Sequence, residues 1–381
     1  MQKVAVTGLR GIPDIMGGVE AHCQELYPRL KALAPNIDVT IYGRAPYLSA
    51  PRSEYHGVAV RGVPSPTQVS LEAILATAFS ILYAWRNHAK VVHLHAIGPS
   101  LLAPLGRLMG LKVIVTHHGK DYDRAKWGAF ASGVLRLGER IAMCFAHQVI
   151  AISPSLAADL KTRFPSSANR VKYIPNGVTH LPAQDLSILE EYGLAPGSYI
   201  MTAARLVPEK GLHDLIEAHK MSGTDHTLII AGDADHGSDY ARQLKAQATD
   251  KIIFAGRRSR SCLRALYENT ALFVLPSYHE GLPIAALEAA SCGAPILLSN
   301  ITGNLDIKLE AKHYFEVGNV KELARKLSGS FKPFTVDAVD IKQRFNWDTI
   351  AHETAEIYAS LENGLGLETA NTTSTTAPTL Q

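Results

Sequence analysis

Two glutamates, Glu280 and Glu288, are separated by seven residues in the stretch SYHEGLPIAALEAASCGAP. A carboxylate can accept hydrogen bonds from two neighbouring hydroxyl groups, so Glu288 would suit a ribose and Glu280 a second sugar. The alternative is that Glu288 is a solvated helix residue and Glu280 an ordinary acidic residue near a helix start. Ala, Leu and Cys residues surround Glu288 in the sequence, where a buried carboxylate without a partner would be costly. This environment favours the sugar-binding interpretation.

The elements around these glutamates predict a site for an anion. Residues 271–275 are an apolar run typical of a parallel strand covered on both faces, and Pro276 ends it. A turn follows, and residues 284–291 are good helix formers. The free backbone N–H groups at the helix N-terminus would favour a diphosphate. The residues of this expected N-terminus are Gly281, Leu282, Pro283 and Ile284.

Two cations, Arg205 and Lys210, follow a predicted strand in the sequence TAARLVPEKG. Open α/β sheets bind ligands beyond the carboxyl ends of their strands. Arginine offers a rigid fork of donors and lysine a mobile point charge, which together suit a diphosphate leaving group. The alternative is a pair of surface cations with no role in binding.

A glycine pair, Gly17 and Gly18, lies in TGLRGIPDIMGGVEAH, whose glycine spacing does not match that of dinucleotide-binding folds. The pair directly precedes a predicted helix that begins near Val19. A ligand phosphate or sugar could therefore approach the backbone closely at this point. The alternative is a tight turn between strand and helix.

Histidines lie at the ends of two predicted strands. His93 and His95 are in the strand at residues 91–95, and His117 and His118 follow the strand at residues 113–116. In an extended segment His117 and His118 point to opposite faces, so we expect only one of them to enter a cleft and no metal pair to form. A neutral imidazole can donate a hydrogen bond to a sugar hydroxyl, which is the role we consider for His118. A structural histidine is the alternative.

Length and composition limit the possible classes of protein. The chain has 381 residues, 46% of them hydrophobic, which is enough for two domains with separate cores. A formal charge of +3 argues against a dedicated nucleic-acid binder. No signal-peptide pattern is evident, and the longest apolar stretch, residues 71–85, predicts a packed helix and not a membrane span. Four widely spaced cysteines without a CxxC pair indicate reduced thiols in a cytoplasmic protein and no zinc site: Cys23, Cys144, Cys262 and Cys292.

Short β-rich runs alternate with helical patterns, as is typical of open parallel sheets. The predicted strands of the first half are residues 4–7, 39–42, 58–62, 91–95, 113–116 and 148–152. Those of the second half are residues 199–202, 227–231, 252–255, 272–275 and 295–298. The pattern predicts two doubly wound α/β domains, a boundary at residues 176–182 and a ligand cleft between the domains.

These features resemble family 4 of the glycosyltransferases, retaining enzymes with the GT-B fold, over residues 1–363. The matching segments are Gly17-Gly18, His118-Gly119, Ser153-Pro154-Ser155, Pro175-Asn176-Gly177-Val178, Arg205 to Lys210, and Glu280 to Glu288. The resemblance implies two Rossmann-like domains facing across a cleft, with residues 1–178 for the acceptor and 179–345 for a nucleotide-sugar donor.

The end of the chain is expected to form a helix and a tail. In the resembled family the last helix, here residues 346–363, packs back on the first domain, and its apolar face would be Phe345, Ile350, Ala351, Ile357, Tyr358 and Leu361. Residues 364–381 are rich in Thr, Ala and Asn, which predicts a disordered tail.

The resemblance also implies roles for the site residues. Arg205 and Lys210 would neutralise the donor diphosphate, together with the backbone amides after Glu280. Glu288 would hold the ribose, and Glu280 the hydroxyls of the transferred sugar. His118 would contact that sugar near the reacting carbon.

Gly17 and Gly18 would let the acceptor and the donor phosphate approach the first domain. No carboxylate is placed as a covalent nucleophile, unlike in retaining glycosidases, so the resemblance implies front-face transfer assisted by the departing phosphate. No cofactor is expected, and no metal, because the two cations supply the positive charge. Asp233 and Asp235 form an acidic D-A-D sequence that leaves the metal question open.

Within the family, GIPDIMGGVE and GKDYDRAKWG resemble a bacterial subgroup of rhamnosyltransferases and other surface-polysaccharide enzymes. A UDP- or dTDP-sugar donor and a glycan or lipid-diphosphate-linked acceptor would follow. Two other classes stay open. One is another enzyme of similar shape, either a sugar-nucleotide epimerase, which would need no acceptor, or a glycan phosphorylase, which would need a cofactor lysine that we cannot identify. The other is a catalytically silent nucleotide-sugar-binding protein.

An excess of cations in the first half suggests contact with an anionic membrane, at the inner face of the plasma membrane, or with a lipid-diphosphate acceptor. Scattered solvated cations are the alternative. The residues concerned are Arg86, His88, Lys90, Arg107, Lys112, Lys120, Arg124, Lys126, Arg136 and Arg140.

Overall fold

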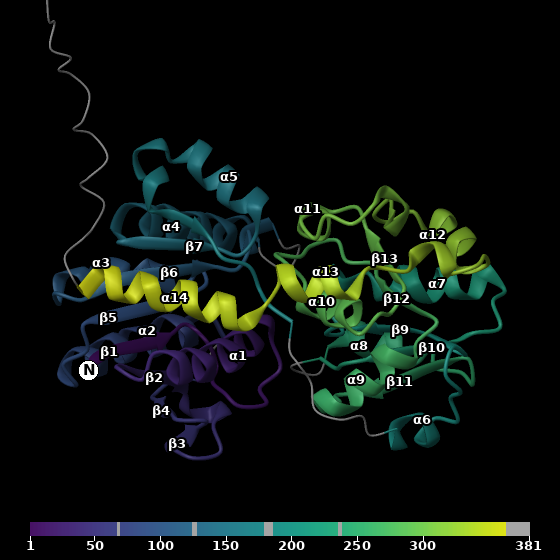
Figure 1. The fold of residues 1–381 in the computed structure, drawn as a ribbon, viewed down its shortest axis with the longest axis horizontal. Helices are drawn as coiled ribbons and strands as arrows, with labels where there is room; N and C mark the ends of the chain where they lie inside the picture. The colour runs from purple at the N-terminus through teal and green to yellow at the C-terminus, as the bar shows by residue number, and fades with distance from the viewer. Residues whose placement is uncertain (67–68, 124–127, 179–185, 235–237, 363–381) are drawn as a thin grey trace, which may run out of the picture.

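The structure is a computed structural model that describes residues 1–66, 69–123, 128–178, 186–234 and 238–362. Two β-sheets with helices on both faces lie side by side (Figure 1). This confirms the predicted α/β class with two Rossmann-like units. Part of the expected boundary, residues 179–182, and the expected tail, residues 364–381, lie outside the described residues.

The first sheet has the strand order β3-β4-β2-β1-β5-β6-β7-β8, and all neighbouring strands are parallel except β3 and β4. Its strands are β1 (Gln2–Thr7), β2 (Ile37–Arg44), β3 (Arg52–Tyr55), β4 (Val58–Val63), β5 (Val91–His95), β6 (Lys112–His117), β7 (Gln148–Ala151) and β8 (Val171–Tyr173). The helices of this half are α1 (Gly18–Leu33), α2 (Val69–Arg86), α3 (Ala103–Leu108), α4 (Ala129–Phe145) and α5 (Pro154–Arg163). Short 3-10 turns are η1 (Ala45–Tyr47), η2 (Pro99–Leu102), η3 (Asp121–Asp123) and η4 (Pro165–Arg170).

The second sheet is entirely parallel, with the order β11-β10-β9-β12-β13-β14. Its strands are β9 (Tyr199–Ala203), β10 (Thr227–Ala231), β11 (Ile252–Gly256), β12 (Leu272–Leu275), β13 (Ile296–Ser299) and β14 (Tyr314–Phe315). The helices are α6 (Ser187–Glu191), α7 (Leu212–Ser222), α8 (Asp239–Lys245), α9 (Arg260–Asn269), α10 (Ile284–Ser291), α11 (Thr302–Leu305), α12 (Val320–Leu327), α13 (Ala338–Arg344) and α14 (Trp347–Glu362). The 3-10 turns are η5 (Pro208–Lys210), η6 (Ala311–His313) and η7 (Lys332–Phe334).

Each sheet separates two hydrophobic cores, one on each face. The central strands are buried on both faces, and every residue of β5 and of β12 is buried. Apolar runs of this kind fit parallel strands covered by helices, because no face remains for water. The result is a rigid strand edge from which loops can present side chains.

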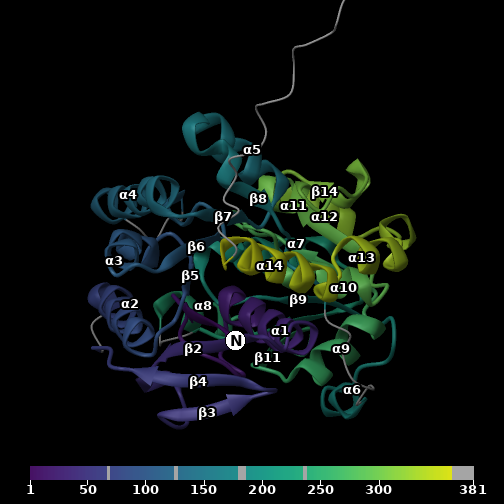
Figure 2. The ribbon, with the colours of Figure 1, turned by 60° about the vertical axis from the view of Figure 1, so that its left-hand side comes forward.

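The last helix, α14, follows the second half in the chain and lies along α1 of the first half (Figures 1 and 2). Trp347, Ile350 and Tyr358 belong to the core formed by β1, β2 and α1. Phe345 differs from the expectation for this helix. It precedes α14 and packs in the core of the second half. The Val178 N–H donates a hydrogen bond to the Phe345 carbonyl (2.7 Å), which holds the chain at this position before α14 begins.

Three strands were not predicted from the sequence: β3, β8 and β14. All are short, with two to four residues, and β3 and β8 contain charged residues, so no apolar run marks them. The apolar stretch at residues 71–85 is a helix, as predicted, but three of its large side chains are exposed: Leu75, Phe79 and Trp85. No helix among the described residues is long and apolar enough to cross a membrane. All four cysteines are free thiols.

Candidate active site

Lys210 and Glu280 meet at the carboxyl edge of the second sheet. The Nζ of Lys210 lies 2.6 Å from the Oε1 of Glu280, and both side chains are largely shielded from solvent. The hydroxyl of Ser277 donates a second hydrogen bond to the same oxygen (2.7 Å). The contact forms because β9 and β12 are parallel neighbours, so the segments that follow them emerge side by side. Two residues expected to bind different parts of one ligand are therefore in direct contact.

Close packing of glycine backbone holds this edge together. Gly211, between η5 and α7, has a positive φ of 63°, and a Cβ there would lie 2.2 Å from the carbonyl oxygen of Pro276. A side chain at this position would separate the Lys210 turn from the end of β12. Arg205 follows β9 by two positions and is partly buried at the same edge.

The predicted helix start is present, and α10 begins at Ile284 with Pro283 as its N-cap residue. No side chain among the described residues caps this end, so the first backbone N–H groups of α10 have no side-chain acceptor at the cap. Gly281 lies against the first half of the molecule, since a Cβ on it would lie 2.3 Å from the carbonyl oxygen of His118. A Cβ on Gly119 would in turn lie 3.1 Å from the Cα of Gly281. The two halves thus touch through backbone, and this contact brings His118 to the Glu280 loop.

Glu288 is a carboxylate without a hydrogen-bonding partner in the described part of the chain. It lies in the second turn of α10, and burial raises its pKa, an effect that the positive charge of Arg260 opposes. Arg260, the first residue of α9, also forms an ion pair with Glu25 on α1. A half-buried carboxylate to which no described group donates a hydrogen bond is a candidate for binding ligand hydroxyls.

The glycine pair has two different environments. A Cβ on Gly17 would lie 1.9 Å from the Oε2 of Glu20, in the space that the Arg10–Glu20 ion pair occupies. Nothing lies within 4 Å of a Cβ on Gly18, so the backbone there faces open space. Gly17 therefore has an internal packing reason to be glycine, whereas Gly18 leaves room for a ligand.

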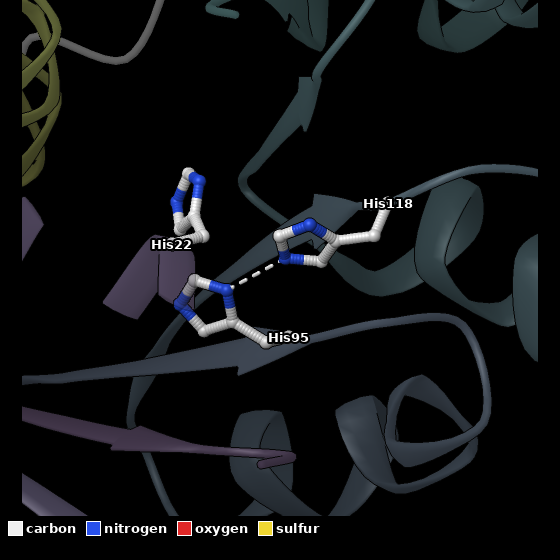
Figure 3. Close-up of side chains that lie close together, drawn as sticks. All are labelled: His22, His95 and His118. Carbon is white, nitrogen blue, oxygen red and sulfur yellow. Dashed lines mark hydrogen bonds between the residues drawn. The ribbon is translucent and has the colours of Figure 1, made fainter. Parts of the chain in front are cut away.

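His118 belongs to a histidine cluster, which we define as His22, His93, His95 and His118. The Nδ1 of His95 lies 2.9 Å from the Nε2 of His118, and His22 packs edge-on against His118 (Figure 3). Burial lowers the pKa of all four, to about 4 for His22 and about 3 for His93, so the rings are neutral at neutral pH. His117 turns away to Glu139, with Nε2 and Oε1 3.0 Å apart. The two consecutive histidines thus have different partners, as predicted.

Two residues of this region were missed by the sequence analysis as functional candidates. His22, on α1, enters the site only because α1 packs beside β5. Asn176 accepts a hydrogen bond from the His22 ring (Nδ1 to Oδ1, 2.9 Å), and its Nδ2 donates to the carbonyl of Leu282 (2.7 Å). Asn176 therefore links the histidine cluster to the start of α10, and the quoted segment Pro175-Asn176-Gly177-Val178 was the available signal.

The D-A-D sequence can be followed only in part. Asp233 accepts a hydrogen bond from the Lys245 ammonium (2.8 Å), which lowers the pKa of the carboxyl group. Asp235 lies outside the described residues.

Comparisons with known proteins agree with this architecture. Residues 16–180 match the model of glycosyltransferase family 4, and residues 192–329 match that of glycosyl transferases group 1. A relative described as an uncharacterized glycosyltransferase of Methanocaldococcus jannaschii is 26% identical over 93% of this chain and 97% of its own. The α-maltose-1-phosphate synthase of Mycolicibacterium smegmatis is 25% identical over 93% of this chain and 98% of its own. An Escherichia coli UDP-Gal:α-D-GlcNAc-diphosphoundecaprenol α-1,3-galactosyltransferase is 27% identical over 79% of this chain and 81% of its own.

Solved structures share the fold. Sucrose-phosphate synthase from Thermosynechococcus elongatus superimposes with a TM-score of 0.79 at 18% identity, covering 96% of this chain and all of its own (100%). Anabaena HepE in complex with UDP and glucose gives a TM-score of 0.74 at 20% identity, covering 94% of this chain and 100% of its own. The two matched family models together cover strands of both sheets and most of the chain. The chain therefore belongs to glycosyltransferase family 4 and has the GT-B fold.

Proposed function

We propose that this protein is a retaining glycosyltransferase that moves a sugar from a UDP- or dTDP-sugar to a glycan or lipid-diphosphate-linked acceptor in bacterial surface polysaccharide biosynthesis. The observation that carries the proposal is the Lys210–Glu280 pair beside the start of α10, which has no side-chain cap among the described residues. Glu288, one turn further on, receives no hydrogen bond from the residues that the structure describes. Relatives support the reaction class: the Escherichia coli protein is named for UDP-Gal and a diphosphoundecaprenol acceptor, and HepE was solved with UDP and glucose.

In this proposal the diphosphate binds at the edge where β9 and β12 end. Lys210 and Arg205 contact its oxygens, and the N-terminus of α10 supplies backbone N–H donors. Charge grows on the diphosphate as the bond to the sugar breaks, so these contacts strengthen in the transition state and lower the barrier. Lys210 and Arg205 neutralise the charge on the diphosphate in place of a divalent metal, and the reaction needs no metal or other cofactor.

Glu280 has two tasks in this mechanism. Its hydrogen bonds with Lys210 and Ser277 fix the carboxylate orientation before any ligand binds. One carboxylate can still accept hydrogen bonds from the hydroxyls of the transferred sugar. Glu288 accepts the ribose hydroxyls, and His118 contacts the sugar from the opposite half.

Transfer on one face of the sugar gives retention of configuration. The departing phosphate accepts the proton of the acceptor hydroxyl, which attacks from the same side. Neither glutamate of the site is assigned as a nucleophile, because Glu280 is engaged by Lys210 and we assign Glu288 to the ribose. Gly18, with open space before its backbone, is the point where the acceptor or donor phosphate approaches the first half.

The donor class can be tested before any acceptor is known. A thermal-shift panel of UDP-, dTDP-, GDP- and ADP-sugars should raise the melting temperature with one nucleotide class, because a ligand that binds only the folded state stabilises it. The anomeric configuration of the product, read by NMR, then tests retention, and a preparation treated with EDTA tests metal independence. No shift with any nucleotide sugar would contradict donor binding.

Contact with an anionic membrane is a further part of the proposal. On α4, Phe130 and Leu137 are exposed, and the neighbouring Arg136 and Arg140 are exposed as well. Exposed apolar and basic side chains on one helix suit the surface of an anionic bilayer. Arg124 and Lys126, part of the predicted cation excess, lie outside the described residues. Flotation with anionic and neutral liposomes checks this, and equal recovery with both would contradict it.

A further inference from the structure

We propose that His22, His95 and His118 form a binding site for one Zn²⁺ or a similar divalent transition-metal ion. One ring nitrogen of each lies within 4.8 Å of the others, and no other group of three or more His, Cys, Asp or Glu side chains with this geometry occurs in the described part of the chain. The three rings come from α1, from the end of β5 and from the residue after β6, and they surround a common point (Figure 3).

Asn176 prepares His22 as a ligand. The Asn176 Nδ2 donates to the Leu282 carbonyl, which leaves its Oδ1 facing the Nδ1 of His22. An amide oxygen can only accept, so the Nδ1 of His22 must carry the proton. Since the buried ring is neutral, its Nε2 then has a free lone pair. A ligating histidine whose other nitrogen donates to a protein oxygen is the usual arrangement at metal sites.

His95 has a similar partner. Its Nε2 lies 2.6 Å from the hydroxyl of Tyr27, and that hydroxyl lies 3.1 Å from the Nδ1 of His93. The Nε2 of His93 is 2.7 Å from the Thr116 hydroxyl. The Nδ1 of His93 also lies 2.7 Å from the hydroxyl of Tyr358, so His93 can accept at Nδ1 and donate from Nε2 to Thr116. If the Nε2 of His95 then donates to Tyr27, the Nδ1 of His95 is left as a lone pair. That nitrogen is the one directed at His118.

The donor set selects the kind of ion. Neutral imidazoles suit Zn²⁺, Co²⁺, Ni²⁺ or Cu²⁺, whereas Mg²⁺, Ca²⁺ and Mn²⁺ prefer oxygen ligands. Three histidines leave a fourth tetrahedral position open for water or an anion. Tetrahedral Zn–N bonds of about 2.0–2.1 Å would separate the nitrogens by about 3.3 Å, so the rings must move only by an ångström or so. His118, which lies beyond the strand and is partly buried, has the freedom to make that adjustment.

The three histidines all belong to the first half, whereas Lys210 and Arg205 belong to the second. A bound ion would occupy the ring of His118, which we propose as a contact of the transferred sugar. Metal binding should therefore compete with the donor sugar and inhibit transfer, a consequence that rests on the proposed function.

A cobalt titration tests the site itself, without donor or acceptor. Co²⁺ added to the EDTA-treated and dialysed protein should give the intense visible bands of tetrahedral coordination, saturating at one ion per chain, and Zn²⁺ should displace it. His22→Gln and His118→Gln should each weaken Co²⁺ binding by at least ~10-fold, because losing a ligand should cost no less than losing a hydrogen-bond partner of a ligand. His352→Gln, on the exposed side of α14, is the matched control and should leave the titration unchanged.

The melting temperature without metal shows whether each variant is folded, and His118→Gln is the safer of the two because its ring is the less buried. No tetrahedral spectrum up to ~1 mM Co²⁺, or equal binding in both folded variants and the wild type, would overturn the site. A transferase assay with added Zn²⁺ tests the consequence separately. Retained Co²⁺ binding without inhibition would overturn the competition with donor and leave the metal site in place.

Discussion

The two halves of the molecule present different chemistry where they meet. The second half presents charges: Lys210 and Glu280 form an ion pair, and Glu288 is a half-buried carboxylate that receives no hydrogen bond from the described residues. The first half presents the histidine cluster, whose rings burial keeps neutral. The difference fits a division of labour in which a diphosphate meets full charges and uncharged hydroxyls meet neutral donors and acceptors.

The electrostatic consequences differ as well. A charged pair in a partly shielded site is oriented before the ligand arrives and acts most strongly on charge that develops during reaction. A neutral imidazole costs less to bury than a charged group, but protonating it in the folded protein is unfavourable. Acid should therefore destabilise the first half more than the second.

The largest expected effect is on the charged side. We expect Lys210→Ala to lower kcat/KM by ~100- to 1,000-fold, as is typical for removing one contact to developing charge. Lys245→Ala is the matched control, because Lys245 pairs with Asp233 in the same half and is not among the residues assigned to the donor. Steady-state kinetics with the identified donor measure both. Turnover of Lys210→Ala within a few-fold of wild type would contradict the assignment.

Acid sensitivity should distinguish the two halves. Burial lowers the pKa of His22 from 6.5 to about 4, so the unfolded chain binds the proton more tightly than the folded one. The stabilisation is complete above pH 6.5 and is lost as the pH falls toward 4, by ~2 kcal/mol at pH 5 for this residue, at ~1.4 kcal/mol per unit. His93 acts in the same direction.

Hydrogen exchange measured at pH 7 and pH 5, corrected for intrinsic rates, checks this. Protection in α1, β5 and β6 should fall more than protection in β9 and β12. In the second half, burial also lowers the pKa of His219 and His313, but backbone hydrogen bonds oppose the shift. An equal loss in both halves would contradict the comparison, and His22→Gln should reduce the loss in the first half.

Glu288 offers a test in which activity and stability move apart. We expect Glu288→Gln to lower kcat/KM by ~10- to 100-fold, because an amide offers only one acceptor oxygen to the ribose. Stability at pH 7 should hold or rise. Burial raises the pKa of Glu288, so the folded state binds its proton more tightly, and the ionised form costs stability above that pKa.

The cost disappears near pH 4, where the carboxyl group is protonated in the folded and largely in the unfolded chain. The melting-temperature difference between variant and wild type should therefore shrink as the pH falls from 7 to 4. Glu217→Gln, at an exposed position on α7, serves as the control. A variant less stable than wild type at pH 7 would show that the carboxylate stabilises the fold and is not held for a ligand.

The local elements of the site were predictable, and the contacts between them were not. Residues 284–291 form α10 with the bounds expected, because a proline, a glycine and a run of helix formers mark both the turn and the helix. The Lys210–Glu280 contact joins residues that only the β9–β12 pairing brings together. No pattern within the sequence encodes which strands become neighbours.

The histidine cluster shows the same limit more strongly. His93, His95 and His118 could be placed at strand ends from the sequence, whereas His22 lies in a helix and looks like any buried helical residue. It joins the cluster through the packing of α1 on β5, and Tyr358 reaches His93 (2.7 Å) only because α14 returns to the first half. Tertiary packing, and not local propensity, creates this part of the site.

The smallest effect concerns the link between the two sides. Arg260 on α9 pairs with Glu25 on α1, and its charge also opposes the raised pKa of Glu288. We expect Arg260→Gln to raise the donor KM by about 3- to 10-fold, since a partly exposed ion pair contributes on the order of 1 kcal/mol.

Loss of the Arg260–Glu25 ion pair should also let the two halves separate more often, which small-angle scattering would record as a larger radius of gyration without donor. Arg242→Gln, which removes an exposed cation paired with Asp239 on α8, should change neither quantity. If donor restores the wild-type radius of gyration in Arg260→Gln, the ion pair favours the closed arrangement, and donor binding to the second half depends on its contact with the first. If the radius never changes, the backbone contact of Gly119 with Gly281 is sufficient to hold the two halves together.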